Sequence, residues 1–146
     1  CKISSIIYKW LDREIVLMFD WKKPTVQMLG RWQPWHEGHR ALFVRCLSKT
    51  GQVIIQVRDV EGASGGGMQD DNPFNWDQVC ENIEKDLQTC GYHRGEDYEI
   101  MLVPNITNIT YGRGVGYVFE EETFSEELTS ISATKIRQNL RKEGKL

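Results

Sequence analysis

The chain of 146 residues lacks several features that mark common protein classes. It has no excess of positive charge, because 18 Lys and Arg stand against 21 Asp and Glu. A general nucleic-acid binder usually carries a basic excess, so this balance disfavours that class. The sequence also has no run of about 18 apolar residues, and it therefore predicts no transmembrane helix and no membrane partner. What remains open is a protein that binds a small ligand through a few local cations.

Cysteine is also scarce and its spacing is uninformative. Cys1, Cys46, Cys80 and Cys90 form neither a CxxC pair nor a zinc-type pattern, and four are too few for a disulfide scaffold at this length. We therefore expect reduced thiols in a cytoplasmic protein, with no structural metal site.

Strand and helix patterns alternate through the middle of the chain. Short β-branched or apolar runs predict strands and amphipathic segments predict helices, in the order 25–29, 37–48, 52–57, 76–90 and 98–104. This alternation predicts an α/β fold: a Rossmann-like open parallel sheet with helices on both faces, in a single domain over residues 18–146.

The two ends of the chain and one loop complete the organisation. Apolar residues at helical spacing over 1–17 predict an N-terminal extension or remnant helix, with a partner-binding helix as the alternative. Within the loop 61–73, the glycine-rich part 62–67 is a candidate lid, with simple disorder as the alternative. A short strand is expected near 117–119, and residues 130–144 predict a strand end that runs into a helix.

The stretch GRWQPWHEGH, residues 30–39, follows the first predicted strand and opens the first predicted helix. Ligands of open α/β sheets bind beyond the carboxyl ends of the strands, and a helix start offers N–H groups that suit phosphate. His36 and His39 are three residues apart and share one face of a helix that begins there. Gly38 removes a side chain that would block a ligand. Zinc is the weaker alternative, because no third ligand has a suitable spacing.

This stretch resembles the HxGH signature of the nucleotidylyltransferase superfamily, in the GRFQPxHxGH form of adenylyltransferases such as the archaeal type that uses nicotinamide mononucleotide. The segment ISATKIR, residues 131–137, resembles the second signature of the superfamily, ISxTxxR. The two signatures stand in the same order as in the superfamily, and the resemblance covers roughly residues 24–143.

The resemblance implies roles for residues of both signatures. His36, His39 and Arg137 would be catalytic, with the histidines on the nucleotide phosphates. Further nucleotide contacts are implied for Gly30, Arg31, Gln33, Gly38, Ser132 and Thr134. Hydroxyl groups and a guanidinium at a helix start are suited to oxyanions, which agrees with this assignment.

The implied reaction is nucleotidyl transfer from a nucleoside triphosphate to a phosphorylated small-molecule acceptor, with release of pyrophosphate and with Mg²⁺ on the phosphates. Arg31 and Gln33 favour ATP, because the cytidylyltransferase form GxFDxxHxGH lacks both. CTP as the donor and a nucleotide-binding module without catalysis are the alternatives. Members of the superfamily are often homo-oligomers, and no feature of this sequence demands one.

Two features depart from the superfamily pattern or extend it. Trp32 and Trp35 stand where phenylalanine is more usual. Arg58, at the end of the second predicted strand, and Arg113, in the glycine-rich segment 111–117, are candidate contacts for the acceptor or its phosphate. The alternatives are a pair between Arg58 and Asp59 and a solvated Arg113.

Overall fold

The computed structural model describes residues 6–9, 14–60, 72–124 and 131–145. Its first elements are strands β1 (Ile6–Lys9) and β2 (Glu14–Leu17), which pair antiparallel with Ile6 opposite Leu17. The prediction of a helix in this part of the chain is therefore wrong. Both strands are rich in isoleucine and valine, whose branched side chains favour strands, and this preference outweighs an apolar spacing that also fits a helix.

Three parallel strands form the sheet of the domain. They are β3 (Val26–Gly30), β4 (Val53–Arg58) and β5 (Tyr98–Val103), and they lie in the order β3-β4-β5. In the register, Met28 lies opposite Ile55, and Ile55 lies opposite Ile100. The three predicted strands are confirmed, with ends that differ by one residue.

Three helices accompany the sheet: α1 (Glu37–Thr50), α2 (Trp76–Thr89) and α4 (Ala133–Lys142). Asn75 begins α2 as predicted, since its side chain accepts a hydrogen bond from the Gln78 N–H. Gly51 ends α1 with a φ of 82°, a left-handed conformation that glycine adopts without steric cost. The part of the chain that the structure describes is thus a small α/β domain.

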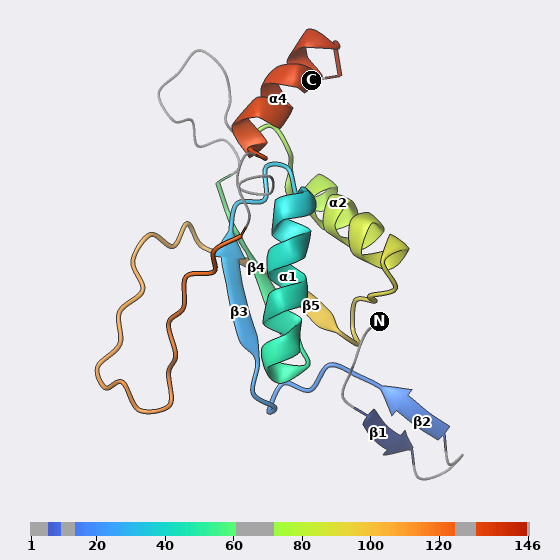
Figure 1. The fold of residues 1–146 in the computed structure, drawn as a ribbon, viewed down its shortest axis with the longest axis vertical. Helices are drawn as coiled ribbons and strands as arrows, with labels where there is room; N and C mark the ends of the chain where they lie inside the picture. Colours follow the sequence, from blue (N-terminus) through green and yellow to red (C-terminus); the bar gives the residue numbers. More distant parts are fainter. Residues whose placement is uncertain (1–5, 10–13, 61–71, 125–130, 146) are drawn as a thin grey trace.

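Helices α1 and α2 cover the same face of the sheet (Figure 1). Their buried side chains, among them Phe43 and Ile83, form one core with Ile55 and the other inward residues of the strands. The prediction of helices on both faces is corrected here, because within the described residues both helices lie on one face. The opposite face carries a mixture of polar and apolar side chains, among them Gln27, Ile54 and Glu99. Two right-handed crossovers that step in one direction, β3 to β4 to β5, bring both helices to one side.

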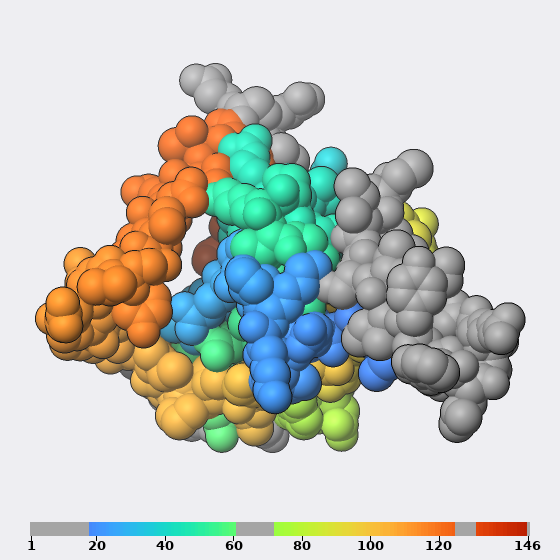
Figure 2. All heavy atoms as spheres, turned by 90° about the horizontal axis from the view of Figure 1, so that it is seen from below, coloured from blue at the N-terminus to red at the C-terminus, as the bar shows by residue number. Residues whose placement is uncertain are grey.

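Residues 104–124, which we call the arm, join β5 to the part of the chain before α4. The arm contains neither helix nor strand, so the prediction of a strand near 117–119 is wrong. It stands away from the body of the domain, with an opening between the two (Figure 2), and its end returns to α1. There Arg45 donates to the Thr123 carbonyl at 2.8 Å, and Lys49 pairs with Glu120 at 3.1 Å.

None of the helices in the described ranges is both long and apolar enough to cross a membrane. The candidate lid at 62–67 lies outside the described residues.

Candidate functional site

The two histidines of the first signature lie at the start of α1, next to the carboxyl end of β3. His36 is the residue before the first turn, and its Nδ1 accepts a hydrogen bond from the Gly38 N–H at 3.0 Å. The Nδ1 of His39 accepts one from the His36 N–H at 3.3 Å. The imidazole rings stack, with 3.6 Å between their centroids. The expectation that the two side chains share a face of α1 is therefore met.

These hydrogen bonds determine where each imidazole carries its proton. A backbone N–H can only donate, so both Nδ1 atoms are unprotonated acceptors and the hydrogen lies on Nε2. Burial lowers the pKa of His39 to about 3, with a smaller contribution from His36 in the same direction. Burial also lowers the pKa of His36. At neutral pH the structure therefore presents two uncharged rings, each with one N–H donor.

Two tryptophans enclose His39 on one side. The ring of Trp32 meets the His39 ring edge-on at 4.7 Å between centroids, and the Trp35 ring lies 5.6 Å away. A side chain at Gly30 would come within 2.9 Å of the Trp32 ring. In this structure, the missing side chain at position 30 therefore makes room for Trp32.

Gln33 and Arg31 use their side chains on the segment that leads into α2. The amide of Gln33 donates to the Phe74 carbonyl and accepts from the Phe74 N–H, each at 2.9 Å. Arg31 donates to the Asn72 side chain at 3.1 Å. Both residues were expected to contact a nucleotide, and here they connect the turn after β3 to the start of α2.

The second signature lies against the first, beyond the carboxyl end of the sheet (Figure 1). Arg137 is only 3% exposed, and its guanidinium donates to the Gln33 carbonyl at 2.6 Å. The Thr134 hydroxyl accepts a hydrogen bond from the same guanidinium at 3.3 Å, and the Ser132 hydroxyl accepts one from the Lys135 N–H. The structure thus brings Arg137 to the turn that carries the histidines, although the two signatures are about a hundred residues apart.

The two arginines expected at the acceptor do not join this group. Arg58, at the end of β4, donates through Nε and one terminal nitrogen to the Asn105 side chain, at 3.2 and 2.7 Å. Asn105, rather than Asp59, is thus its hydrogen-bond partner. Arg113 is exposed on the arm, and within the described ranges it makes no hydrogen bond or ion pair.

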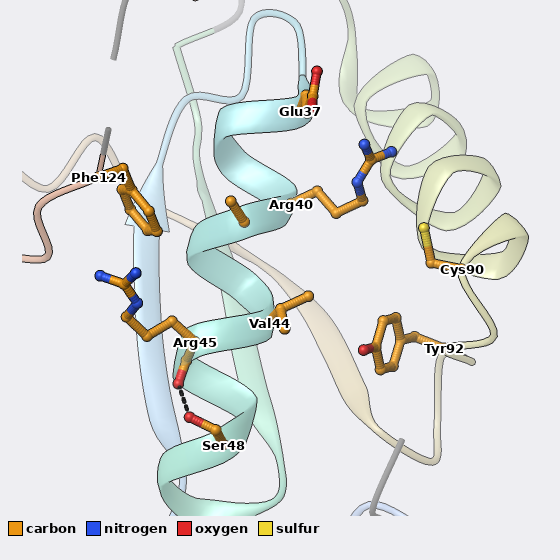
Figure 3. Close-up of a pocket in the computed structure, with 9 residues that line it drawn as sticks. Glu37, Arg40, Val44, Arg45, Ser48, Cys90, Tyr92 and Phe124 are labelled. Carbon is orange, nitrogen blue, oxygen red and sulfur yellow. Dashed lines mark hydrogen bonds between the residues drawn. The ribbon is translucent and has the colours of Figure 1, made fainter. Parts of the chain in front are cut away.

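Two hollows are lined in part by residues of the first signature, but by neither of its histidines. One runs along the outer side of α1 past Arg40 and Val44 to Tyr92, with Arg45 and Phe124 at its other edge (Figure 3). The guanidinium of Arg45 lies over the Phe124 ring at 4.2 Å. The other hollow lies behind the first signature, where Pro34 and Trp35 meet α2 and α4.

Sequence reasoning missed the residues that support the signatures. Asp86 on α2 accepts hydrogen bonds from Trp35 at 2.9 Å and from Arg40 at 2.7 Å. Asn72 accepts a hydrogen bond from Arg31, and Asn105 accepts one from Arg58. These partners are 41 to 51 residues away in sequence, and no local pattern distinguishes them from solvated polar residues.

No group of three or more histidine, cysteine or acidic residues that could hold a metal ion occurs in the part of the chain that the structure describes. No known family model matches the chain, and no curated protein sequence matches it.

Proposed function

We propose that this protein is a nucleotidylyltransferase that moves the AMP group of ATP to a phosphate-bearing small molecule and releases pyrophosphate. The observation that carries the proposal is the contact between Arg137 and the Gln33 carbonyl, which unites the two signatures. It places a buried guanidinium beside the turn whose end carries two uncharged imidazoles. In this proposal the three parallel strands and their helices are part of a Rossmann-like nucleotide-binding domain that works in the cytoplasm.

The proposed reaction is a direct in-line displacement. An oxygen of the acceptor phosphate forms a bond to the α-phosphorus while the bond from that phosphorus to the bridging oxygen breaks, and pyrophosphate takes up the charge. The Nε2–H groups of His36 and His39 donate to phosphate oxygens, and Arg137 stabilises the leaving charge. The chain itself supplies no covalent nucleophile. Positioning and preorganised donors therefore provide the acceleration.

Mg²⁺ accompanies the triphosphate in this proposal and is bound by the nucleotide and water, as is common for this ion. No step depends on a metal ion held by the described side chains, which contain no suitable cluster. The preference for ATP depends on the sequence form with Arg31 and Gln33 alone, because both side chains contact the chain itself in the structure. CTP is therefore tested alongside ATP.

The first experiment measures thermal shifts with ATP, CTP and GTP in the presence of Mg²⁺, followed by pyrophosphate release with a panel of phosphorylated acceptors. We expect a shift with ATP and release that depends on the acceptor. A nucleotide shift without release under any acceptor would instead support the binding module. No shift with any nucleotide would contradict the proposal.

Variants of His36 separate catalysis from helix capping. His36→Ala removes both the cap and the Nε2–H donor, whereas in His36→Asn the amide oxygen replaces Nδ1 as the acceptor for the Gly38 N–H. We expect both variants to lose on the order of 10²–10³ in pyrophosphate release. Only His36→Ala should lose stability, by about 1 kcal/mol in urea unfolding. Release near the wild-type rate in His36→Asn would remove His36 from the site.

A further inference from the structure

The two tryptophans beside His39 each carry a hydrogen bond that phenylalanine cannot make. The indole N–H of Trp32 donates to the Gln56 carbonyl at 3.1 Å. The indole N–H of Trp35 donates to a carboxylate oxygen of Asp86 at 2.9 Å. The two rings are thus hydrogen-bonded to different elements, Trp32 to β4 and Trp35 to α2. Phenylalanine, which the GRFQPxHxGH form has at the position of Trp32, could not make the bond to β4.

Trp32 has a backbone conformation that needs such support. Its φ is 55°, in the left-handed region where a residue with a side chain is strained by roughly 1–2 kcal/mol. Its ring fills the space above Gly30, where a Cβ would come within 2.9 Å. The Gln56 bond is a local compensation for that strain, because it joins the turn after β3 to the neighbouring strand.

The Asp86 carboxylate joins the turn to two helices. One of its oxygens accepts from Trp35 and the other from Arg40 on α1, at 2.7 Å. A carboxylate that uses both oxygens has little freedom to turn. Trp35 is therefore held to α2 by a hydrogen bond to a charged group, which is stronger than a bond between neutral groups.

Both rings meet each other and His39. Their centroids lie 5.3 Å apart, and each ring lies within 5.6 Å of the imidazole. The imidazole of His39 also stacks on that of His36. Movement of either indole would therefore admit water beside His39 and change the direction of its Nε2–H.

We propose that Trp32 and Trp35 are positioning residues whose indole N–H bonds to β4 and α2 fix the ring of His39 for the nucleotide phosphates. The catalytic part of this inference rests on the proposed function, whereas the position of the imidazole does not.

The test replaces each tryptophan with phenylalanine, which keeps an aromatic ring and removes the N–H group. Trp21→Phe is the matched control, because Trp21 is 69% exposed and has no part in the signature. NMR titration of the imidazole signals reports the pKa of His39 in the full chain. In an active enzyme, kcat and KM are measured as well.

In Trp35→Phe we expect the pKa of His39 to rise by about 1 toward its ordinary value, because the freed ring admits water. We expect kcat to fall on the order of tenfold while KM changes by less than about threefold. Trp32→Phe should also raise the pKa of His39 and lower kcat, but by smaller amounts, because the bond that it loses goes to a neutral carbonyl. Trp21→Phe should move neither.

An unchanged pKa of His39 in both Trp32→Phe and Trp35→Phe overturns the inference. An unchanged kcat in Trp35→Phe of an active enzyme overturns it as well. If the wild-type protein shows no turnover with any acceptor, the proposed function fails, but the NMR titration still decides whether the indole bonds position His39. The two failures are therefore distinguishable.

Discussion

The turn after β3 and the arm at 104–124 are both irregular segments, yet their side chains are used in opposite ways. In the turn, Trp32, Gln33 and Trp35 are buried, and each makes a hydrogen bond to a distant element. In the arm, the large apolar side chains from Ile109 to Phe119 are more than half exposed, and Tyr111 and Phe119 stack mainly on each other.

The comparison shows how an irregular backbone can be held in one conformation. The turn has no repeating hydrogen bonds of its own. It is held instead by hydrogen bonds to a backbone carbonyl of β4, to a carboxylate of α2 and from a guanidinium of α4. This support leaves the imidazoles in one arrangement before any ligand binds. The arm is attached through charged side chains at its end, where Arg45 and Lys49 reach Glu122. Exposed ion pairs of this kind stabilise little, so we expect the arm to tolerate substitution where the turn does not.

Of the substitutions that test the support of the turn, that of Arg137 is expected to have the largest effect. Arg137→Ala leaves the Gln33 carbonyl without its buried donor and removes the cation from the site. We expect on the order of 10²–10³ less pyrophosphate release. We also expect a loss of about 2–4 kcal/mol in the free energy of urea unfolding.

Two matched variants of α4 sharpen this test. Lys142→Ala removes an exposed cation from the last turn of the same helix and should change neither quantity. Arg137→Lys retains the charge but not the planar donor set, so it should recover part of the nucleotide affinity and little of the rate. Full activity in Arg137→Ala would show that the two signatures do not act together.

Gln33 is the second test, because its amide makes two hydrogen bonds to the backbone of Phe74. Gln33→Ala should lower the unfolding free energy by about 2–3 kcal/mol. Gln33→Glu can still accept from the Phe74 N–H but cannot donate to the carbonyl, so we expect an intermediate loss. Gln138→Ala, at an exposed position of α4, is the control. If Gln33→Ala and Gln138→Ala were equally stable in urea, the role given to Gln33 would be contradicted.

The acid sensitivity of the turn follows from His39. Its pKa is about 3 when folded and near 6.5 when unfolded, so between these values the unfolded chain binds a proton that the folded chain does not. The unfolding free energy should therefore fall as the pH drops below 6.5, by up to about 1.4 kcal/mol per pH unit from this group. Above pH 6.5 the imidazole of His39 is neutral in both the folded and the unfolded chain, so it adds no pH dependence to the unfolding free energy.

A variant isolates the contribution of the imidazole from that of the carboxyl groups. In His39→Asn the amide oxygen can replace Nδ1 as the acceptor for the His36 N–H, and the side chain does not titrate. Urea unfolding at pH 7.5, 6.5 and 5.5 should give a shallower pH dependence for this variant than for the wild type. Parallel curves would mean that His39 is not buried in the neutral form.

The sequence predicted the parts of this molecule that local patterns encode. The strands at β3, β4 and β5 follow from β-branched runs, and the start of α2 follows from Asn75. The pair of histidines at one helix start was also readable from spacing. The helix expected over 1–17 was wrong, because the same apolar residues fit a strand when their partner strand is near.

The supporting contacts of the site were not readable from the sequence. Gln33 was expected to face a nucleotide, and only the folded chain places the Phe74 backbone within reach of its amide. Asp86 gives no local signal, because an acidic residue near the end of a helix is usually solvated. Its role depends on how closely α2 approaches α1 and the turn, and this is a property of the packed sheet and helices.

The smallest expected effect is that of substituting a valine in the arm, and a valine in the body gives the matched comparison. Val53, at the start of β4, is 0% exposed, whereas Val118 in the arm is 77% exposed. Val53→Ala removes buried methyl groups and should cost about 2 kcal/mol of unfolding free energy. Val118→Ala removes the same atoms from water and should stay within about 0.5 kcal/mol of the wild type. A comparable loss in both variants would mean that the arm packs against the protein in solution, and its exposed apolar residues would then belong to the core rather than to a tolerant surface.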